Sequence, residues 1–321
     1  MIYPQEMLRA VTSGWLRAKE NDGYLFFSRF TARQEQLNTQ RRQAAKNGST
    51  AGMCLRFFIP AGSVSFRYRS CPGSSRNHYS MDVYRDDSLF LQQTGTAGDE
   101  GILSFDNPSP AEICIWLPCL AGIGIRDLSA PEGLTPIRKT RHILFMGDSI
   151  TQGYDADAPS LCYTNRLTRY LDAECVNQAI GGDVFFADNL GEDLIPLSPD
   201  HIFIAYGTND WAHSRPVEET AREYLKTLRS LFPRVPVTVL LPIRRLECDE
   251  NGKKNEAGLT LQEVRLLLRT AAQEYNSDVI DCFPFLPADP ALYSDRCLHP
   301  NDRGFDHYFE GLKKALKQGS L

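Results

Sequence analysis

The middle of the chain contains the segment that sets its architecture, Ile143-Leu144-Phe145-Met146-Gly147-Asp148-Ser149-Ile150-Thr151. The first four residues form a continuous apolar run, which is typical of a strand buried on both faces of a sheet. Similar runs follow at residues 202–205, 237–241 and 279–280. Amphipathic segments separate these runs, so the pattern predicts a parallel sheet whose strands are joined by right-handed crossover helices.

The segments between the runs carry helix signals. Pro216 suits the first turn of a helix, and apolar residues recur with a helical period from there to Phe232. Thr260 and Glu263 form a capping box ahead of a second apolar stripe. Ser160 is expected to cap a further helix. Strands and helices therefore alternate through the second half of the chain.

The part of the chain before residue 129 has a different texture. Around Phe66 and Ile115, apolar and polar residues alternate with a period of two, which indicates half-buried strands. Further short candidates, bounded by turn residues, lie at 23–29, 53–59, 81–84, 89–92 and 123–128. The polar residues 34–46 are expected to form a long loop. Many short strands with such turns predict a β-sandwich of the jelly-roll kind, joined to the second half by the linker-like residues 129–133.

Composition excludes several classes of protein. The chain has 321 residues, of which 42% are hydrophobic and 23% charged, as expected for two modest folded domains. A net charge of −5 with only short Arg clusters argues against a nucleic-acid partner. No stretch approaches the roughly 18 consecutive apolar residues of a membrane helix, and the first residues lack an apolar signal core. We therefore expect neither a membrane nor a nucleic acid as partner.

The cysteine and histidine patterns argue against disulfides and metals. Nine cysteines form an odd set without a CxxC pair, which favours reduced thiols and a cytoplasmic location. The six histidines are scattered, without an HxH or HExxH motif. We therefore expect no metal site.

Polar clusters follow the predicted strands or lie near the C-terminus. In open parallel sheets, ligands bind beyond the carboxyl ends of the strands, so these clusters are expected to meet at one edge. They supply a hydroxyl, small backbone donors, an amide, and an acid with a histidine, which are the groups that acyl transfer requires. The residues concerned are Asp148 and Ser149, Gly181 and Gly182, Asn209, and Asp295 with His299.

These blocks resemble those of the SGNH, or GDSL-type, hydrolases, a family of esterases, lipases and carbohydrate deacetylases. The resemblance covers roughly residues 143–312 and rests on GDSIT after one strand, GTND after a later strand and HPN near the end. The preceding β-domain is similar to that of two-domain members such as the family-2 carbohydrate esterases. The resemblance implies a three-layer α/β/α domain of flavodoxin-like type over residues 140–321, preceded by a jelly-roll-like domain over residues 1–135.

The resemblance also implies roles for the proton-transfer residues. Ser149 is the expected nucleophile, His299 its base, and Asp295 the acid that orients the imidazole. In the family the acid usually lies three residues before the histidine, whereas here it lies four before. A loop absorbs such an insertion easily, so we expect Asp295 to be used. The alternative is a dyad of Ser149 and His299 in which a backbone carbonyl orients the imidazole.

The remaining roles concern the oxyanion hole and its surroundings. Three donors are implied: the backbone N–H of Ser149, the backbone N–H of Gly182 and the side-chain amide of Asn209. Gly181 is the alternative to Gly182. Asp148 is expected to hold the nucleophile loop through hydrogen bonds, and Trp211 either to wall a sugar-sized pocket or to pack in the core.

Together these observations predict hydrolysis of a carboxylic ester through a seryl acyl-enzyme. The expected substrate is a small-molecule or carbohydrate ester, with a short acyl group such as acetyl favoured by the two-domain resemblance. No cofactor is expected, because protonation states and dipoles suffice for this chemistry. Two alternatives stay open: an acyltransferase that passes the same acyl-enzyme to an alcohol, and a catalytically inactive carbohydrate-binding protein. The oligomeric state is left open.

Overall fold

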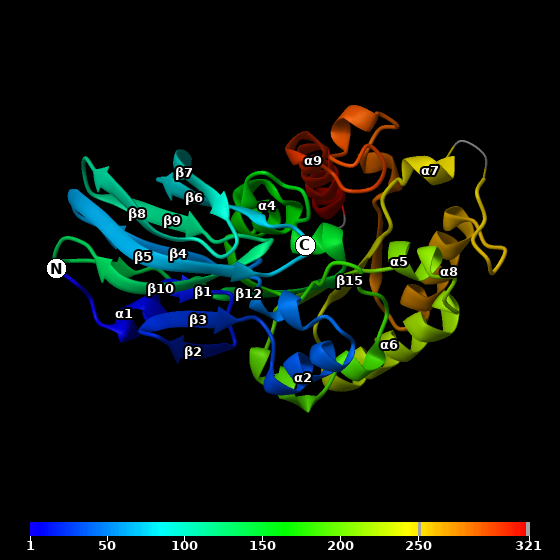
Figure 1. Cartoon of the computed structure of the whole chain (residues 1–321). Helices are drawn as coiled ribbons and strands as arrows, with labels where there is room; N and C mark the ends of the chain where they lie inside the picture. The colour runs from blue at the N-terminus through cyan, green and yellow to red at the C-terminus, as the bar shows by residue number, and fades with distance from the viewer. Residues whose placement is uncertain (250–251, 319–321) are drawn as a thin grey trace. The chain divides into compact units, whose positions relative to one another are not determined.

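The computed structural model describes residues 1–249 and 252–318, and its contacts divide the chain into two compact units (Figure 1). The first unit comprises three segments, Met1–Thr140, Asp157–Ser160 and Asp172–Asn177. The second comprises the rest, Arg141–Ala156, Leu161–Leu171 and Gln178–Leu321.

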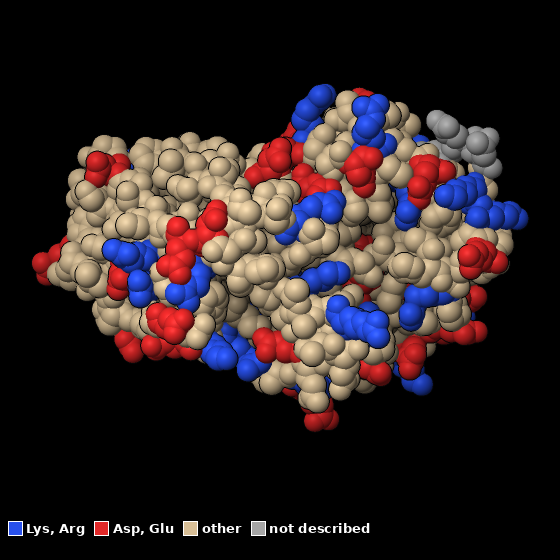
Figure 2. All heavy atoms as spheres, viewed as in Figure 1, with Lys and Arg blue, Asp and Glu red and all other residues tan. Residues whose placement is uncertain are grey.

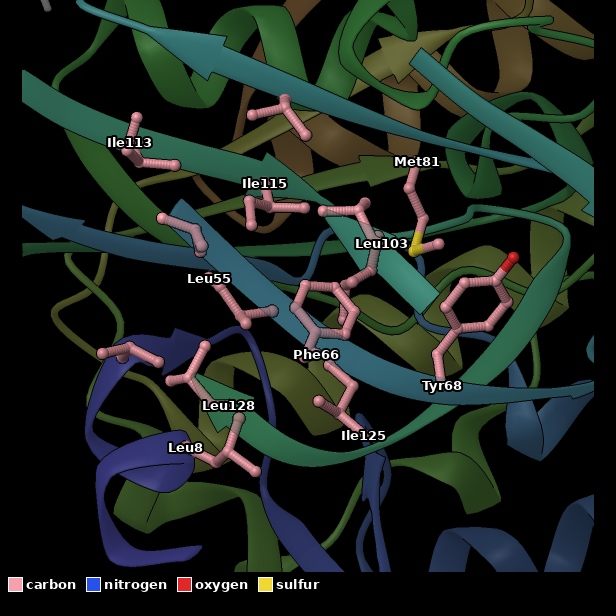
Figure 3. Packing of buried hydrophobic residues seen from close by; sticks show 14 of the residues in the cluster. Leu8, Leu55, Phe66, Tyr68, Met81, Leu103, Ile113, Ile115, Ile125 and Leu128 are labelled. Carbon is pink, nitrogen blue, oxygen red and sulfur yellow. The ribbon is translucent and has the colours of Figure 1, made fainter. Parts of the chain in front are cut away.

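The first unit contains two antiparallel sheets that share one core. One sheet has the order β1-β4-β9-β6-β7, with β11 beside β4, and the other has the order β2-β3-β10-β5-β8. Apolar side chains from both sheets meet between them, for example Leu55 and Ile115 from the first and Phe66 and Ile125 from the second (Figure 3). The prediction of a β-rich first region is thereby confirmed. The strands are β1 (Thr12–Ser13), β2 (Arg17–Asn21), β3 (Tyr24–Ser28), β4 (Cys54–Ile59), β5 (Gly62–Pro72), β6 (His78–Arg85), β7 (Ser88–Thr96), β8 (Glu100–Asn107), β9 (Ala111–Trp116), β10 (Ala121–Ser129) and β11 (Thr135–Pro136).

Helices also occur in this unit, and one corrects the sequence analysis. The prediction of a long loop over residues 34–46 is wrong, because α2 (Ala32–Gln40) and a 3-10 turn, η1 (Ala44–Gly48), occupy this segment. A capping box begins α2: the Gln34 N–H donates to the Thr31 hydroxyl, and the Thr31 N–H donates to the Gln34 side chain. The helix was missed because its residues are almost all polar, which leaves no apolar stripe to detect. A further helix, α1 (Gln5–Val11), precedes β1.

The second unit is built on a parallel sheet. The strand order is β13-β12-β14-β15-β16, and β12, β14, β15 and β16 pair in parallel along that order. An order in which the second strand lies outside the first is the flavodoxin-like arrangement, so the predicted fold class is confirmed. The strands of this sheet are β12 (Arg141–Gly147), β14 (His201–Ala205), β15 (Val237–Leu241) and β16 (Asp278–Asp281) from the second unit, together with β13 (Ala173–Asn177), which lies in the segment Asp172–Asn177 grouped with the first unit.

Helices cover this sheet on both faces. Figure 1 shows α4 and α9 on one side of it and α6 and α8 on the other, and each of these pairs is in contact. The predicted capping box of Thr260 and Glu263 begins α8. The α-helices are α3 (Ser149–Gln152), α4 (Tyr163–Tyr170), α5 (Thr208–Ala212), α6 (Val217–Leu231), α7 (Leu246–Asp249), α8 (Leu261–Glu274) and α9 (Asp302–Gln318). Short 3-10 turns are η2 (Pro159–Leu161), η3 (Ala187–Asn189), η4 (Glu192–Leu197), η5 (Phe283–Phe285) and η6 (Pro290–Leu292).

The prediction that Ser160 caps a helix is wrong. Ser160 lies in the turn η2, and α4 begins later, with Cys162 at its N-cap. The Ser160 N–H instead donates to the buried Asp82 carboxylate at 2.8 Å. The Ser160 backbone thus binds a side chain that is distant in sequence.

The surface in view carries charges of both signs. Figure 2 shows Lys and Arg interspersed with Asp and Glu on this face of the described residues, without a continuous basic area. Among the described helices, none is long and apolar enough to cross a membrane. None of the nine cysteines forms a disulfide, and all nine lie in the described part of the chain.

Candidate active site

The nucleophile candidate lies at the turn from β12 into α3. Ser149 is the first residue of α3, and Asp148 is its N-cap, with the Asp148 side chain accepting the Ile150 N–H at 3.0 Å. This cap fixes the start of the short helix and with it the direction of the serine side chain. The Ser149 Oγ lies 2.9 Å from Nε2 of His299, within hydrogen-bond distance. Asp148 thus has the contacts expected of a residue that holds the nucleophile loop.

The acid candidate lies against the other nitrogen of the imidazole. The Asp295 Oδ2 is 2.7 Å from the His299 Nδ1. The Asp295 Oδ1 accepts three backbone N–H groups, those of Cys297, Leu298 and His299. The extra residue between acid and base is absorbed inside this turn, where Arg296 takes a left-handed conformation with φ of 61°. The insertion seen in the sequence therefore leaves Asp295 within hydrogen-bond distance of the base.

Asp295 is held in its anionic form. Partial burial acts to raise the pKa of its carboxyl, but the hydrogen bonds from His299 and from the Leu298 and Cys297 N–H groups outweigh it. The pKa of Asp295 is consequently well below its ordinary value. A carboxylate that stays charged beside Nδ1 fixes the tautomer with a free lone pair on Nε2, the one that faces Ser149.

Two loops bring the expected oxyanion donors together. The Asn209 side chain donates to the Asp183 carbonyl at 2.9 Å, which uses one of its two amide hydrogens and leaves the second. Gly182 has a φ of 82°, a conformation that favours glycine. The Gly181 N–H already donates to Gln152 at 2.8 Å. Within the described residues the Gly182 N–H has no hydrogen-bond partner, so it is the better donor candidate of the two glycines.

Two buried carboxylates support this oxyanion side. Burial raises the pKa of Asp148 to about 7, against the opposing effect of the Ile150 N–H that donates to it. Burial also raises the pKa of Asp210 to about 6, against the opposing charge of Arg215. Both acids therefore resist ionisation, in contrast to Asp295.

Arg215 connects the two oxyanion loops. Its Nε lies 3.6 Å from the Asp210 Oδ1, and its Nη2 donates to the Phe185 carbonyl at 3.3 Å. The Phe185 N–H in turn donates to the Asp210 Oδ1 at 3.2 Å. Because Asp210 directly follows Asn209 and Phe185 lies close after Gly182 in the sequence, these contacts hold the two donor loops to one another.

Trp211 packs in the interior of the unit. Its side chain is largely enclosed, with 3% of the residue exposed. The indole N–H donates to the Leu259 carbonyl at 2.9 Å, and the Asn255 side chain donates to the Trp211 carbonyl at 3.0 Å. Of the two roles that the sequence left open for Trp211, these contacts support packing.

The segment after α3 supplies two residues that the sequence analysis did not place against the base. The Tyr154 ring stacks on the His299 imidazole, with centroids 5.7 Å apart. The Asp155 Oδ2 lies 3.9 Å from the His299 Nδ1. Neither residue has a spacing that marks it in the sequence, because the loop between α3 and α4 follows no helical or strand period. Their proximity to the imidazole follows from tertiary structure alone.

The geometry fits acyl transfer. A hydroxyl meets an imidazole whose far nitrogen faces a carboxylate, and amide donors lie on the adjoining loops. Such a set can deprotonate an alcohol and stabilise an oxyanion with side chains and backbone alone. Within the described residues, no group of three or more His, Cys, Asp or Glu side chains is arranged to hold a metal ion.

Fold and site together define an ester hydrolase of the α/β/α class. The model of the GDSL-like Lipase/Acylhydrolase family matches residues 145–307, about half of the chain, and includes all the site residues named above. The chain belongs to this family.

Several solved structures share the fold over almost the whole chain. A salicylyl-acyltransferase from a tetracycline biosynthetic pathway, SsfX3, has a TM-score of 0.80 at 19% identity, covering 97% of this chain and 95% of that one. A putative GDSL-like lipase from Bacteroides ovatus has a TM-score of 0.74 at 16% identity, covering 97% and 96%. A family two carbohydrate esterase from Clostridium thermocellum, solved with cellohexaose, has a TM-score of 0.66 at 13% identity, covering 96% and 98%. No curated protein sequence matches the chain.

Proposed function

We propose that the protein is a serine esterase that cleaves short-chain carboxylic esters through an acyl-enzyme on Ser149. The observation that carries the proposal is the continuous chain of short contacts from the Ser149 Oγ through His299 to Asp295, at 2.9 and 2.7 Å. A serine hydroxyl is a weak nucleophile by itself, and an adjacent base makes it reactive.

In both halves of the reaction the proton moves to and from the His299 Nε2, and it does not pass to Asp295. His299 takes the hydroxyl proton on Nε2 while the Ser149 Oγ bonds to the carbonyl carbon, and Asp295 stabilises the resulting imidazolium. The oxyanion is met by the N–H groups of Ser149 and Gly182 and by the Asn209 amide. His299 then gives its proton to the leaving alcohol, and water repeats the sequence on the acyl-enzyme.

An acylated carbohydrate is the proposed type of substrate. Support comes from the fold shared with family two carbohydrate esterases, which likewise extends over both units of the chain. We accordingly expect acetyl esters to be cleaved faster than esters with long acyl chains.

The second candidate is an acyltransferase with the same acyl-enzyme. The specific observation in its favour is the fold shared with a salicylyl-acyltransferase at a TM-score of 0.80. The two functions differ only in the nucleophile that resolves the acyl-enzyme, which is water in one case and an alcohol in the other.

Labelling and turnover test the proposal together. A fluorophosphonate should attach once to the wild-type chain and not to Ser149→Ala, and that variant should lose on the order of 10⁶ in kcat. The folding of the variant is checked by its thermal unfolding, which we expect to be little changed because only one oxygen is removed. Labelling of another residue, or retained turnover in the variant, would contradict the proposed mechanism.

A substrate panel separates the two candidates. Acetyl, butyryl and octanoyl p-nitrophenyl esters and an acetylated cello-oligosaccharide are assayed in water and with an added alcohol. Release of acid in water, fastest for acetyl, supports the esterase. Turnover only with the alcohol, with the acyl group recovered on it, supports the transferase.

A further inference from the structure

Two carboxylates, not one, face the same nitrogen of the candidate base. The Asp295 Oδ2 lies 2.7 Å from the His299 Nδ1, and the Asp155 Oδ2 lies 3.9 Å from it. The side chain of Asp155 is 9% exposed, against 34% for Asp295. The more enclosed of the two acids is therefore the one that the sequence did not indicate.

The chain brings Asp155 to this position through a bent loop. Helix α3 ends at Gln152, and its C-cap Gly153 is left-handed with a φ of 100°. Asp155 is also left-handed, with a φ of 64°. Left-handed conformations are uncommon for residues other than glycine, although Asp tolerates them better than most. Between the two, Tyr154 stacks on the imidazole. Residues 153–155, which directly follow the helix of Ser149, thus bring Tyr154 and Asp155 close to His299.

A serine on the opposite loop anchors the carboxylate. The Ser294 hydroxyl donates to the Asp155 Oδ2 at 2.7 Å. The Ser294 N–H donates to the His299 carbonyl at 2.9 Å. Asp155 is thereby tied to the same turn that carries the base, and the atom that accepts the serine hydroxyl is also the atom nearest to Nδ1.

The two acids are held in different ways. Asp295 uses one oxygen for three backbone N–H groups and the other for the imidazole. The Asp155 Oδ2 accepts the Ser294 hydroxyl and lies farther from Nδ1, at 3.9 Å. This arrangement makes Asp295 the primary partner of the imidazole and leaves Asp155 as a second anion within reach of it.

We propose that Asp155 is a positioning residue that acts as a second carboxylate for His299. When Ser149 gives its proton to Nε2, both carboxylates stabilise the imidazolium until the proton passes on to the leaving alkoxide. When Asp295 loses its charge, Asp155 takes over the Nδ1–H. This inference rests on the proposed function of Ser149 and His299 and adds a residue to it.

A double-mutant cycle tests the proposal. The proteins compared are the wild type, Asp155→Asn, Asp295→Asn and the double variant. Asparagine has the shape of aspartate, accepts the Ser294 hydroxyl and tolerates a positive φ, so each change removes mainly the charge. Asp289→Asn is the matched control, because Asp289 is an exposed turn cap on the preceding segment, where it accepts the Ala291 N–H.

If Asp155 is a second partner of His299, the effects of Asp155→Asn and Asp295→Asn on kcat should not be independent. Asp155→Asn alone should lower kcat by about threefold with KM unchanged, and Asp295→Asn alone by about 10², while the double variant should lose about 10⁴, the usual effect of an absent triad acid. The control should not change kcat. Equal factors for Asp155→Asn in the wild-type and Asp295→Asn backgrounds would overturn the proposal, because an independent structural effect is additive.

A spectroscopic readout separates this proposal from the esterase mechanism itself. The far-downfield proton resonance of the His299 Nδ1–H, observed at low pH in the Ser149→Ala protein, requires a carboxylate partner and no turnover. It should persist in Asp295→Asn and disappear in the double variant. Disappearance in Asp295→Asn alone would exclude Asp155 as a partner, whatever the enzyme hydrolyses.

Discussion

The two sides of the candidate site use carboxylates in opposite ways. On the histidine side, Asp295 lies in a partly exposed loop and accepts hydrogen bonds from three backbone N–H groups and from the imidazole, and its pKa is held well below the ordinary value. On the oxyanion side, Asp148 and Asp210 are buried, and burial raises their pKa values to about 7 and about 6. The same side chain is thus made a stronger acid in one place and a weaker acid in another.

The contrast matches the charges that the reaction requires. An anion beside His299 stabilises the imidazolium, so Asp295 has to remain charged. A full negative charge behind the donors at Gly182 and Asn209 opposes an oxyanion, so acids there are best kept neutral or paired. Hydrogen bonds from backbone N–H groups help to keep Asp295 charged. Burial disfavours the charged forms of Asp148 and Asp210, and Arg215 pairs with Asp210. The role of each acid in the site can therefore be inferred from the groups that surround it.

The largest expected effect concerns stability and Asp148. Because its folded-state pKa of about 7 exceeds the unfolded value, the native protein binds more protons than the unfolded chain between about pH 4 and 7. Asp148 therefore lowers the free energy of unfolding as pH rises through this window. Asp148→Asn removes this pH dependence. The difference in free energy of unfolding between the variant and the wild type, measured by urea unfolding, should therefore grow in favour of the variant by up to about 4 kcal/mol from pH 4 to pH 7.

Asp295→Asn serves as the opposite case in the same measurement. The lowered pKa of Asp295 stabilises the native state above the unfolded pKa, and this contribution is lost as pH falls toward the folded-state pKa. The wild type should thus exceed this variant in stability above about pH 4 and lose that advantage only in stronger acid. If both substitutions change the free energy of unfolding in the same direction at neutral pH, the two sides of the site do not differ as described.

The next effect is on catalysis and concerns the oxyanion side. Asn209→Ala should lower kcat by about 10²–10³ with little change in KM, because its free amide hydrogen is needed only when charge develops on the carbonyl oxygen. Binding of a trifluoromethyl ketone, which forms an oxyanion on Ser149, should weaken by the same factor. A change confined to KM would mean that Asn209 grips the substrate in its ground state.

The sequence was informative where the chemistry follows strand ends. The apolar runs that became β12, β14 and β15 predicted the sheet, and the polar clusters after them contain Ser149 and Asn209. The one-residue insertion before His299 was visible in the sequence, but its outcome was not, because it depends on the left-handed backbone at Arg296. The periodicity of apolar residues predicts strands and helices, but it gives no information about the conformation of an individual loop residue.

The same limit explains the residues that were missed. Asp155 reaches His299 through two left-handed residues in a loop, and Arg215 reaches Phe185 through a turn after α5. Neither has a fixed spacing from its partner. Helix α2 was missed for a related reason, since a polar helix lacks an apolar stripe and only the capping box at Thr31 marks its start.

The smallest effect concerns Arg215, the cation that links the two oxyanion loops. Arg215 faces Asp210 at 3.6 Å and donates to the Phe185 carbonyl at 3.3 Å. Arg215→Met removes both contacts and frees the loops of Gly182 and Asn209 to separate, while the side chain, partly exposed, leaves no buried cavity. We expect kcat to fall about tenfold, less than the loss of a donor itself, with KM within about twofold.

A second arginine provides the control for this prediction. Arg222 has a similar exposure and is also ion-paired, with Glu218 and Glu274 at 2.6 and 2.8 Å, but its partners lie on the surfaces of α6 and α8. Arg222→Met removes the same charge and should leave kcat unchanged, because exposed ion pairs contribute little. Arg215→Lys should recover only part of the activity, since an ammonium group does not span Asp210 and Phe185 as the guanidinium fork does. Equal losses in Arg215→Met and Arg222→Met would show that net charge, and not the link between the two oxyanion loops, sets the rate.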